Sequence, residues 1–145
     1  MAFDDIERVT AAPAQVAIPH DGLRVSSRAA AARGVPTRYI RIDIGAGLAK
    51  ALCLHGEQSS LRLRFGSGSD AGKIGLSVDV EDGAFPAKKS AKGIWSLTIN
   101  AASADGLFAL EFPKFTVSEP EIVEKGGKPP MAVFSASEAM LAVED

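Results

Sequence analysis

The chain has few of the residues that build disulfide frameworks, zinc sites and membrane spans. Of its 145 residues, one is cysteine and two are histidine. An internal disulfide is therefore excluded, and a Cys/His zinc site is not expected. No apolar run approaches the roughly 18 residues needed to cross a bilayer, and the acidic start lacks the apolar segment of a signal peptide. We expect a protein of a reducing, cytoplasmic compartment with no membrane partner.

A recognisable catalytic constellation is also lacking. The serines form no G-x-S-x-G motif. The single thiol, Cys53, has only His55 near it in sequence, whereas a catalytic thiolate needs both a base and an oxyanion site. The glycine-rich segment GSGSDAGK runs into a strand pattern at Ile74, so it is not a phosphate loop. The sequence predicts a non-enzymatic protein with no cofactor and no metal.

Charge is modest and unevenly distributed. The net charge is −2, and charged residues make up 23% of the chain. Residues 1–40 carry five basic and four acidic groups, residues 41–100 carry eight and six, and residues 101–145 carry three and eight. A strongly basic nucleic-acid-binding domain would show a larger excess. Any contact with nucleic acid must therefore come from local clusters.

Strand-like alternation dominates the middle of the chain. Aromatic residues make up only 6%, and 24 of the apolar residues are alanine, so the core is modest. Apolar and polar residues alternate with the period of half-buried strands. We expect strands at 37–44, 60–65, 73–80, 85–88 and 94–99, with the last two forming a hairpin, and a short helix at 47–54. The predicted fold is mainly β, a small barrel or sandwich of short strands with one short helix.

Both ends of the chain lack a sustained period. The predicted segments are a flexible N-terminal arm (1–36), a β-rich core domain (37–117) and a proline-rich, acidic linker with a C-terminal segment (118–145). Pro113 limits the apolar stretch before Val117 to an edge or broken strand. Near the C-terminus, Met131–Phe134 is expected to be a last strand or a docking segment. Residues 135–143 resemble a short helix capped by Ser135 or Ser137.

One unit, from Arg38 to Val80, has the order strand, short helix, strand, loop, strand. Its sequence is RYIRIDIGAGLAKALCLHGEQSSLRLRFG, followed after the loop by KIGLSVDV. This order resembles the swapped-hairpin domain of AbrB-like transition-state regulators and related antitoxins. There, a strand leads into a helix of the LRxxLGI type, and an xxGDxLxV strand and a hairpin strand follow. Here Gly45 stands where the family often has proline, and the helix carries Lys50 where the family is often rich in arginine.

The resemblance implies a homodimer, because such domains usually interleave hairpins into a barrel, and many of them bind DNA. It therefore implies a regulator that contacts the phosphates of double-stranded DNA through basic side chains. The candidate DNA-binding residues are Arg38, Arg41, Lys50, Arg62, Arg64, Lys88, Lys89 and Lys92. Alternation places Arg62 and Arg64 on one face of a strand, about 7 Å apart.

Two alternatives stay open. The arginines also fit a solvated outer face with ion pairs to residues such as Asp43 or Asp79, and lysines at a hairpin tip often keep a sheet edge soluble. The second function hypothesis is a structural or assembly subunit whose arms order on neighbouring subunits. A regulator needs a coherent basic face, whereas an assembly subunit needs an exposed apolar one.

Overall fold

The structure is a computed structural model that describes residues 18–32, 35–56, 58–66, 69, 71–79, 84–100, 103, 107–124 and 126–142. Its strands are β1 (Leu23–Ala32), β2 (Val35–Ile44), β3 (Gln58–Phe65), β4 (Lys73–Val78), β5 (Phe85–Lys89), β6 (Trp95–Asn100), β7 (Phe115–Val117), β8 (Glu121–Val123) and β9 (Met131–Ser135). Its two short helices are α1 (Ala46–Ala51) and α3 (Glu138–Leu141).

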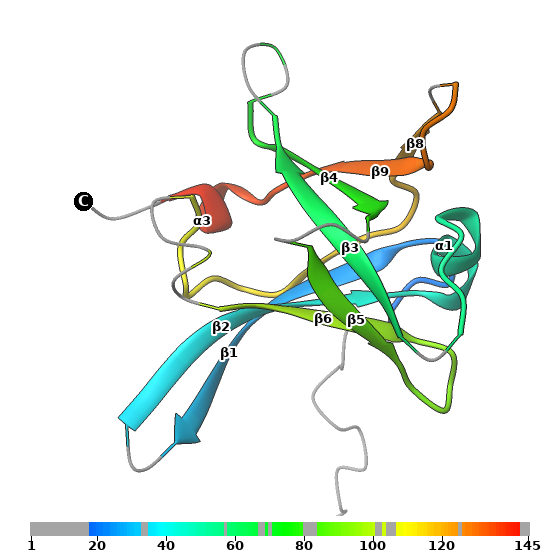
Figure 1. The fold of residues 1–145 in the computed structure, drawn as a ribbon. Helices are drawn as coiled ribbons and strands as arrows, with labels where there is room; N and C mark the ends of the chain where they lie inside the picture. Colours follow the sequence, from blue (N-terminus) through cyan, green and yellow to red (C-terminus); the bar gives the residue numbers. More distant parts are fainter. Residues whose placement is uncertain are drawn as a thin grey trace, which may run out of the picture.

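The nine strands of the described part form one antiparallel sheet in the order β7-β1-β2-β6-β5-β3-β4-β9-β8. The sheet curls into a half-barrel, with β1, β2 and β6 on one side and β4, β9 and β8 on the other (Figure 1). The mainly β prediction is confirmed. The curl gives the sheet an inner face that holds the core and an outer face that is free to carry polar groups.

Alternation explains which residues fill the inner face. In β2, for example, Ile40, Ile42 and Ile44 are fully buried, while Arg41 between them is half-buried on the other side. The core is completed by side chains from six further strands, both helices and the segment before β7: Leu23, Val25, Leu48, Ala49, Leu52, Leu61, Ile74, Leu76, Ala87, Trp95, Leu97, Ile99, Phe108, Phe112, Ala132, Phe134 and Met140. The charged residues Arg41 and Asp43 therefore lie on the outer face of β2, opposite the isoleucines that enter the core.

The junction between β2 and α1 is unusually tight. The Gly45 amide donates to the Gly22 carbonyl at 2.8 Å, and the Gly47 amide donates to the His20 carbonyl at 2.8 Å. At Gly45, a Cβ atom would overlap the carbonyl oxygens of Pro19 and His20. Glycine is therefore required here by close backbone approach, and it fixes where α1 begins.

The second helix anchors the end of the described chain. The Ser137 hydroxyl caps α3 by accepting from the Met140 amide at 3.2 Å, as expected for an N-cap serine. Met140 is fully buried, and its carbonyl accepts from the Ala109 amide at 2.7 Å. α3 thereby holds the irregular segment that leads into β7.

The first hairpin extends beyond the rest of the sheet. β1 and β2 pair over ten residues each, whereas β7 pairs with β1 only from Leu23 to Val25, and β6 pairs with β2 only from Tyr39 to Ile44. The far half of the hairpin projects from the body as a two-stranded ribbon (Figure 1). Among the described residues, β1 beyond Val25 has no strand partner on its outer edge.

Several local predictions are confirmed, including the alternating strands, the helix after β2 and the β5–β6 hairpin, in which Lys88 pairs with Ser96 and Lys89 with Trp95. The last strand, β9, and the Ser137 cap are also found. As predicted from Pro113, the stretch before Val117 is mostly irregular, and only Phe115–Val117 is a strand.

Two predictions for the chain ends are wrong where the structure describes them. The expected N-terminal arm contains β1, because Leu23 and Val25 enter the core and the following residues are held by ten-residue pairing with β2. The expected linker contains β8, and Glu121–Val123 pairs with β9. The described parts of segments 1–36, 37–117 and 118–145 thus share one sheet. Residues 1–17 of the predicted arm lie outside the described residues.

In the part of the chain that the structure describes, neither helix is long and apolar enough to cross a membrane.

Candidate nucleic-acid interface

The outer face of β1, β2, β6 and β5 carries a row of polar side chains. Antiparallel register aligns Arg24 with Asp43, Asp43 with Ser96, and Ser96 with Lys88. Directly paired side chains lie on the same face of a sheet, about 5 Å apart. These four residues therefore form a continuous line across four strands.

Parallel lines run beside this first one. Ser26, Arg41 and Thr98 form the second, and Arg28, Tyr39 and Asn100 form the third. We call this surface the basic face, and its cations are Arg24, Arg28, Arg41 and Lys88. Among the outward positions that the structure describes on these four strands, Asp43 is the one carboxylate.

Asp43 organises the centre of the basic face. Its carboxylate is almost fully buried and accepts from Arg24 Nη2 at 3.0 Å, Arg41 Nε at 2.8 Å and Ser96 Oγ at 2.6 Å. Arg41 Nη2 also donates to Ser96 Oγ at 3.2 Å. One buried anion thus holds two guanidinium groups in fixed positions, and the cluster keeps an excess positive charge.

Asp43 is ionised despite its burial. Loss of solvent acts to raise its pKa, but hydrogen bonds from Ser96, Arg24 and Arg41, together with the charge of Arg41, outweigh this effect and bring the pKa below its ordinary value of 3.8. The ion cluster is therefore intact throughout the neutral range.

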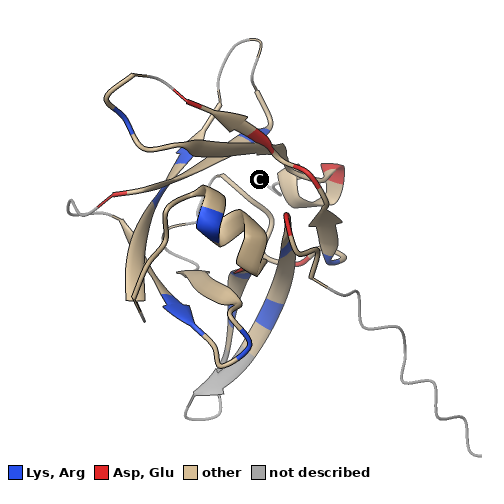
Figure 2. Cartoon of the chain, turned by 90° about the vertical axis from the view of Figure 1, so that its right-hand side faces the viewer, with Lys and Arg blue, Asp and Glu red and all other residues tan. Residues whose placement is uncertain are grey.

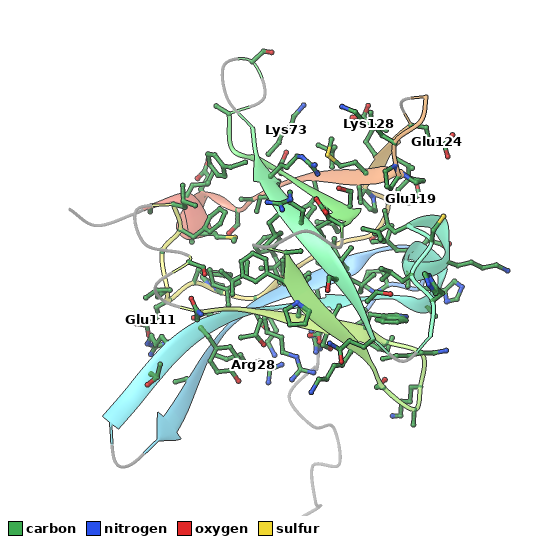
Figure 3. The ribbon with its side chains drawn as sticks, in the orientation of Figure 1. Arg28, Lys73, Glu111, Glu119, Glu124 and Lys128 are labelled. Atoms are coloured by element: carbon green, nitrogen blue, oxygen red, sulfur yellow. The ribbon has the colours of Figure 1, made fainter. Side chains whose placement is uncertain are left out.

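Arg28 and Lys88 stand at the two sides of this cluster. Arg28 Nε donates to Ser26 Oγ at 3.2 Å, and Lys88 is exposed. Figure 3 shows Arg28 on the side of β2 and β6 that faces away from β3 and β4. In the described part of the chain, neither cation forms an ion pair with a carboxylate. Both are available to an external anion.

Acidic residues gather elsewhere on the molecule. Figure 2 shows acidic segments mainly in the upper half of the view, where Lys and Arg also occur, whereas the strands in the lower half carry mainly Lys and Arg. The acids of the C-terminal third include Glu119, Glu121, Glu124 and Glu138, all exposed, on or near β8 and α3. The chain has a net charge of −2, but its basic face is positively charged.

Two of the sequence-predicted residues, Arg41 and Lys88, lie on the basic face. Lys89 pairs with Trp95 and so occupies the opposite face of β5, and Lys92 lies in the turn after it. Lys50 is exposed on α1. Arg38 has the orientation of the core-facing residues of β2 and forms an exposed ion pair with Glu111 at 3.2 Å.

Arg62 and Arg64 share the outer face of β3 but are directed toward β4. Arg62 Nε pairs with Asp79 at 2.7 Å, and Arg64 Nη1 donates to Ser77 Oγ at 2.6 Å. The ion pairs that the sequence left open as an alternative therefore exist for Arg62 with Asp79 and for Arg41 with Asp43. The eight candidates do not form a single cluster.

Sequence reasoning missed Arg24 and Arg28 because it assigned no strand to their segment. The signal was present as the alternation Leu23, Arg24, Val25, Ser26, but it is short and runs into alanines. Asp43 was considered only as an ion-pair partner. Its central role depends on Ser96, which lies 53 residues away in sequence.

Other chemistry is sparse in the described part of the chain. It contains no group of three or more His, Cys, Asp or Glu residues placed to hold a metal ion. Cys53 is exposed, and the His55 ring lies 3.2 Å from the Cys53 carbonyl oxygen. The His55 ring therefore contacts the backbone of Cys53.

Comparisons with protein-family models, curated proteins and solved structures found no match. The AbrB-like resemblance accordingly stays a prediction.

Proposed function

We propose that the chain is a non-enzymatic DNA-binding regulator and that its basic face contacts the phosphates of double-stranded DNA. The observation that carries this proposal is the ratio of charges on the face, where the described outward positions hold four cations and one carboxylate, Asp43. Phosphate neutralisation by Lys and Arg provides most of the sequence-independent affinity of DNA-binding proteins.

The β1–β2 ribbon supports the same proposal. A DNA major groove is about 12 Å wide and accommodates a two-stranded β-ribbon. The ribbon projects from the body and carries Arg28 and Tyr39 on its outer face where it leaves the sheet. Thr98 and Asn100 add exposed hydrogen-bonding groups on the adjacent strand. Cations beside the ribbon would bind backbone phosphates while the ribbon enters a groove.

The expected result is a steep salt dependence. If four cations each neutralise one phosphate, affinity for a duplex falls by about 10²-fold when salt rises from about 50 to about 200 mM. Fluorescence anisotropy of a labelled random-sequence duplex measures this directly. An affinity that stays flat over this range would contradict phosphate binding.

A pair of variants tests which face is used. The double variant Arg28→Gln/Lys88→Gln removes two cations that hold no ion pair among the described residues, and we expect it to reduce the salt slope by about 2. Arg38→Gln is the matched control, because Arg38 lies on the same ribbon but on its opposite face. Equal losses in both variants would show that the basic face is not the contact surface.

The second candidate function, an assembly subunit, is favoured by the open edges of the half-barrel. β7 and β8 have three residues each, and the outer edge of β1 beyond Val25 has no strand partner in the described chain. Unpaired strand edges are templates for another chain. A second copy of this chain is the simplest partner, as in the interleaved barrels of swapped-hairpin domains.

Light scattering of the purified protein, with and without duplex DNA, separates the two functions. A dimer of about twice 15.1 kDa that shifts on adding DNA and releases it with salt supports the regulator. A larger homo-oligomer that ignores DNA supports the assembly subunit. A monomer at every protein concentration would contradict pairing through the open edge.

A further inference from the structure

A pocket lies on the outer face of the other half of the sheet, away from the basic face. Its volume is about 540 Å³, and it lies among β3, β4, β8, β9 and the turn between β8 and β9. It is lined by Arg64, Ser77, Val78, Asp79, Val123, Lys128, Pro129 and Met131. This volume is within the range of small-molecule sites, about 300 to 1,000 Å³.

The residues of β4 explain the floor of the pocket. Of its outward positions, Ser77 lines the pocket and Gly75 lines an adjoining recess, and both residues are small and buried. Longer side chains stand around them, since Arg64 pairs with Gly75 from β3 and Met131 pairs with Ser77 from β9. A Cβ at Gly75 would come within 2.7 Å of Met131 Sδ. Small residues in the centre and long ones at the rim create the depression.

Positive charge is concentrated at the rim. Arg64 donates to Ser77, and Lys128 belongs to the β8–β9 turn. Neither forms an ion pair with a carboxylate among the described residues, whereas the acid of the pocket, Asp79, is paired with Arg62 at 2.7 Å. Figure 3 shows Lys128 on the same side of β4 and β9 as Lys73.

An adjoining recess of about 310 Å³ shares Arg64, Val123 and Met131 with the pocket. It contains Lys73 and the carboxylate of Glu121. Glu121 does not line the first pocket, whose charged groups are Arg64, Lys128 and the Arg62-paired Asp79, and whose apolar walls are valine, proline and methionine. Such a combination selects a ligand that is negatively charged at one end and apolar at the other.

We propose that this pocket binds a small organic carboxylate, with its anionic group between Arg64 and Lys128 and its apolar part against Val123, Pro129 and Met131. A guanidinium group matches the two oxygens of a carboxylate. The proposal is independent of DNA binding, because Arg28 and Lys88 are not part of the pocket.

Titration of the ¹⁵N-labelled protein with hexanoate, followed by NMR, tests the site. We expect saturable shifts of the amides of Ser77, Val123 and Met131. Hexanamide, which has the same chain without the charge, is expected to bind at least tenfold more weakly. Equal binding of hexanamide, or a response to inorganic phosphate as strong as to hexanoate, would overturn the proposed ligand class.

Variants identify the residues involved. Lys128→Met and Arg64→Met are each expected to weaken hexanoate binding about tenfold, while Arg28→Gln/Lys88→Gln leaves it unchanged. Lys128 is exposed in a turn, so its substitution tests the site even if Arg64→Met fails to fold. Unaltered hexanoate affinity in Lys128→Met would overturn the assigned position of the carboxylate.

Discussion

Asp43→Asn is expected to lower the free energy of unfolding by about 3 kcal/mol, because removal of one partner from a buried ion cluster leaves the others uncompensated. Asp43 is buried and holds Arg24, Arg41 and Ser96. In asparagine, an amide NH₂ replaces one carboxylate oxygen and faces donors that need an acceptor. Urea denaturation at pH 7 measures the change.

The pH dependence of the same variant gives a second, independent result. The folded-state pKa of Asp43 is lowered, so the unfolded state binds its proton more readily. The stabilisation from Asp43 is therefore complete above an unfolded pKa of about 4 and is lost as the pH falls through the folded pKa. The stability difference between wild type and Asp43→Asn should be largest at neutral pH and shrink below about pH 4.

Glu111→Gln is the control for this substitution. It removes the carboxylate of another arginine pair, Arg38–Glu111, with the same change of atoms, but the Glu111 side chain is 77% exposed. We expect a loss of at most about 1 kcal/mol. Equal losses at Asp43 and Glu111 would mean that burial of the carboxylate does not determine its contribution.

Gly45→Ala is expected to destabilise the protein by about 3 kcal/mol or to prevent folding. The backbone at this residue has φ −64° and ψ 153°, which alanine adopts without strain. The cost is steric, because the new methyl group would overlap the carbonyl oxygens of Pro19 and His20. The turn before β1 would have to move away from the start of α1. Thermal unfolding followed by circular dichroism measures the loss.

Gly126→Ala is its control. Gly126 lies in the turn between β8 and β9, and no atom lies within 4 Å of a Cβ added there. We expect a change of at most about 0.5 kcal/mol, typical of surface sites. A wild-type unfolding temperature for Gly45→Ala would show that the turn at Pro19 and His20 does not pack on Gly45.

The fold was predictable where alternation is strong and local. Ile40, Ile42 and Ile44 identify β2 from sequence alone, as do Trp95, Leu97 and Ile99 for β6. β1 was not predictable in the same way, because most of its length is alanine and its strand conformation comes from pairing with β2. Strands of low intrinsic preference depend on their neighbours.

The candidate site was predictable only in part, for the same reason. Arg41 and Lys88 stand out as basic residues on expected strands. Their association requires the pairing of β2 with β6 and of β6 with β5, and the first of these joins residues far apart in sequence. Arg24 belongs to the site because β1 pairs with β2 and places it opposite Asp43. Register between distant strands is a tertiary property that the alternation of one strand does not encode.

The strand order also determines how the chain must fold. Hairpins such as β1–β2 and β3–β4 join neighbours in sequence, but Leu23 pairs with Val117, and Ile74 pairs with Phe134. Closing such long loops costs chain entropy before their contacts form, and proteins dominated by non-local pairing fold in milliseconds to seconds. The early hairpins expose their edges during that interval. The ribbon and its arginines are therefore expected to form before the barrel wall that carries the carboxylate pocket is complete.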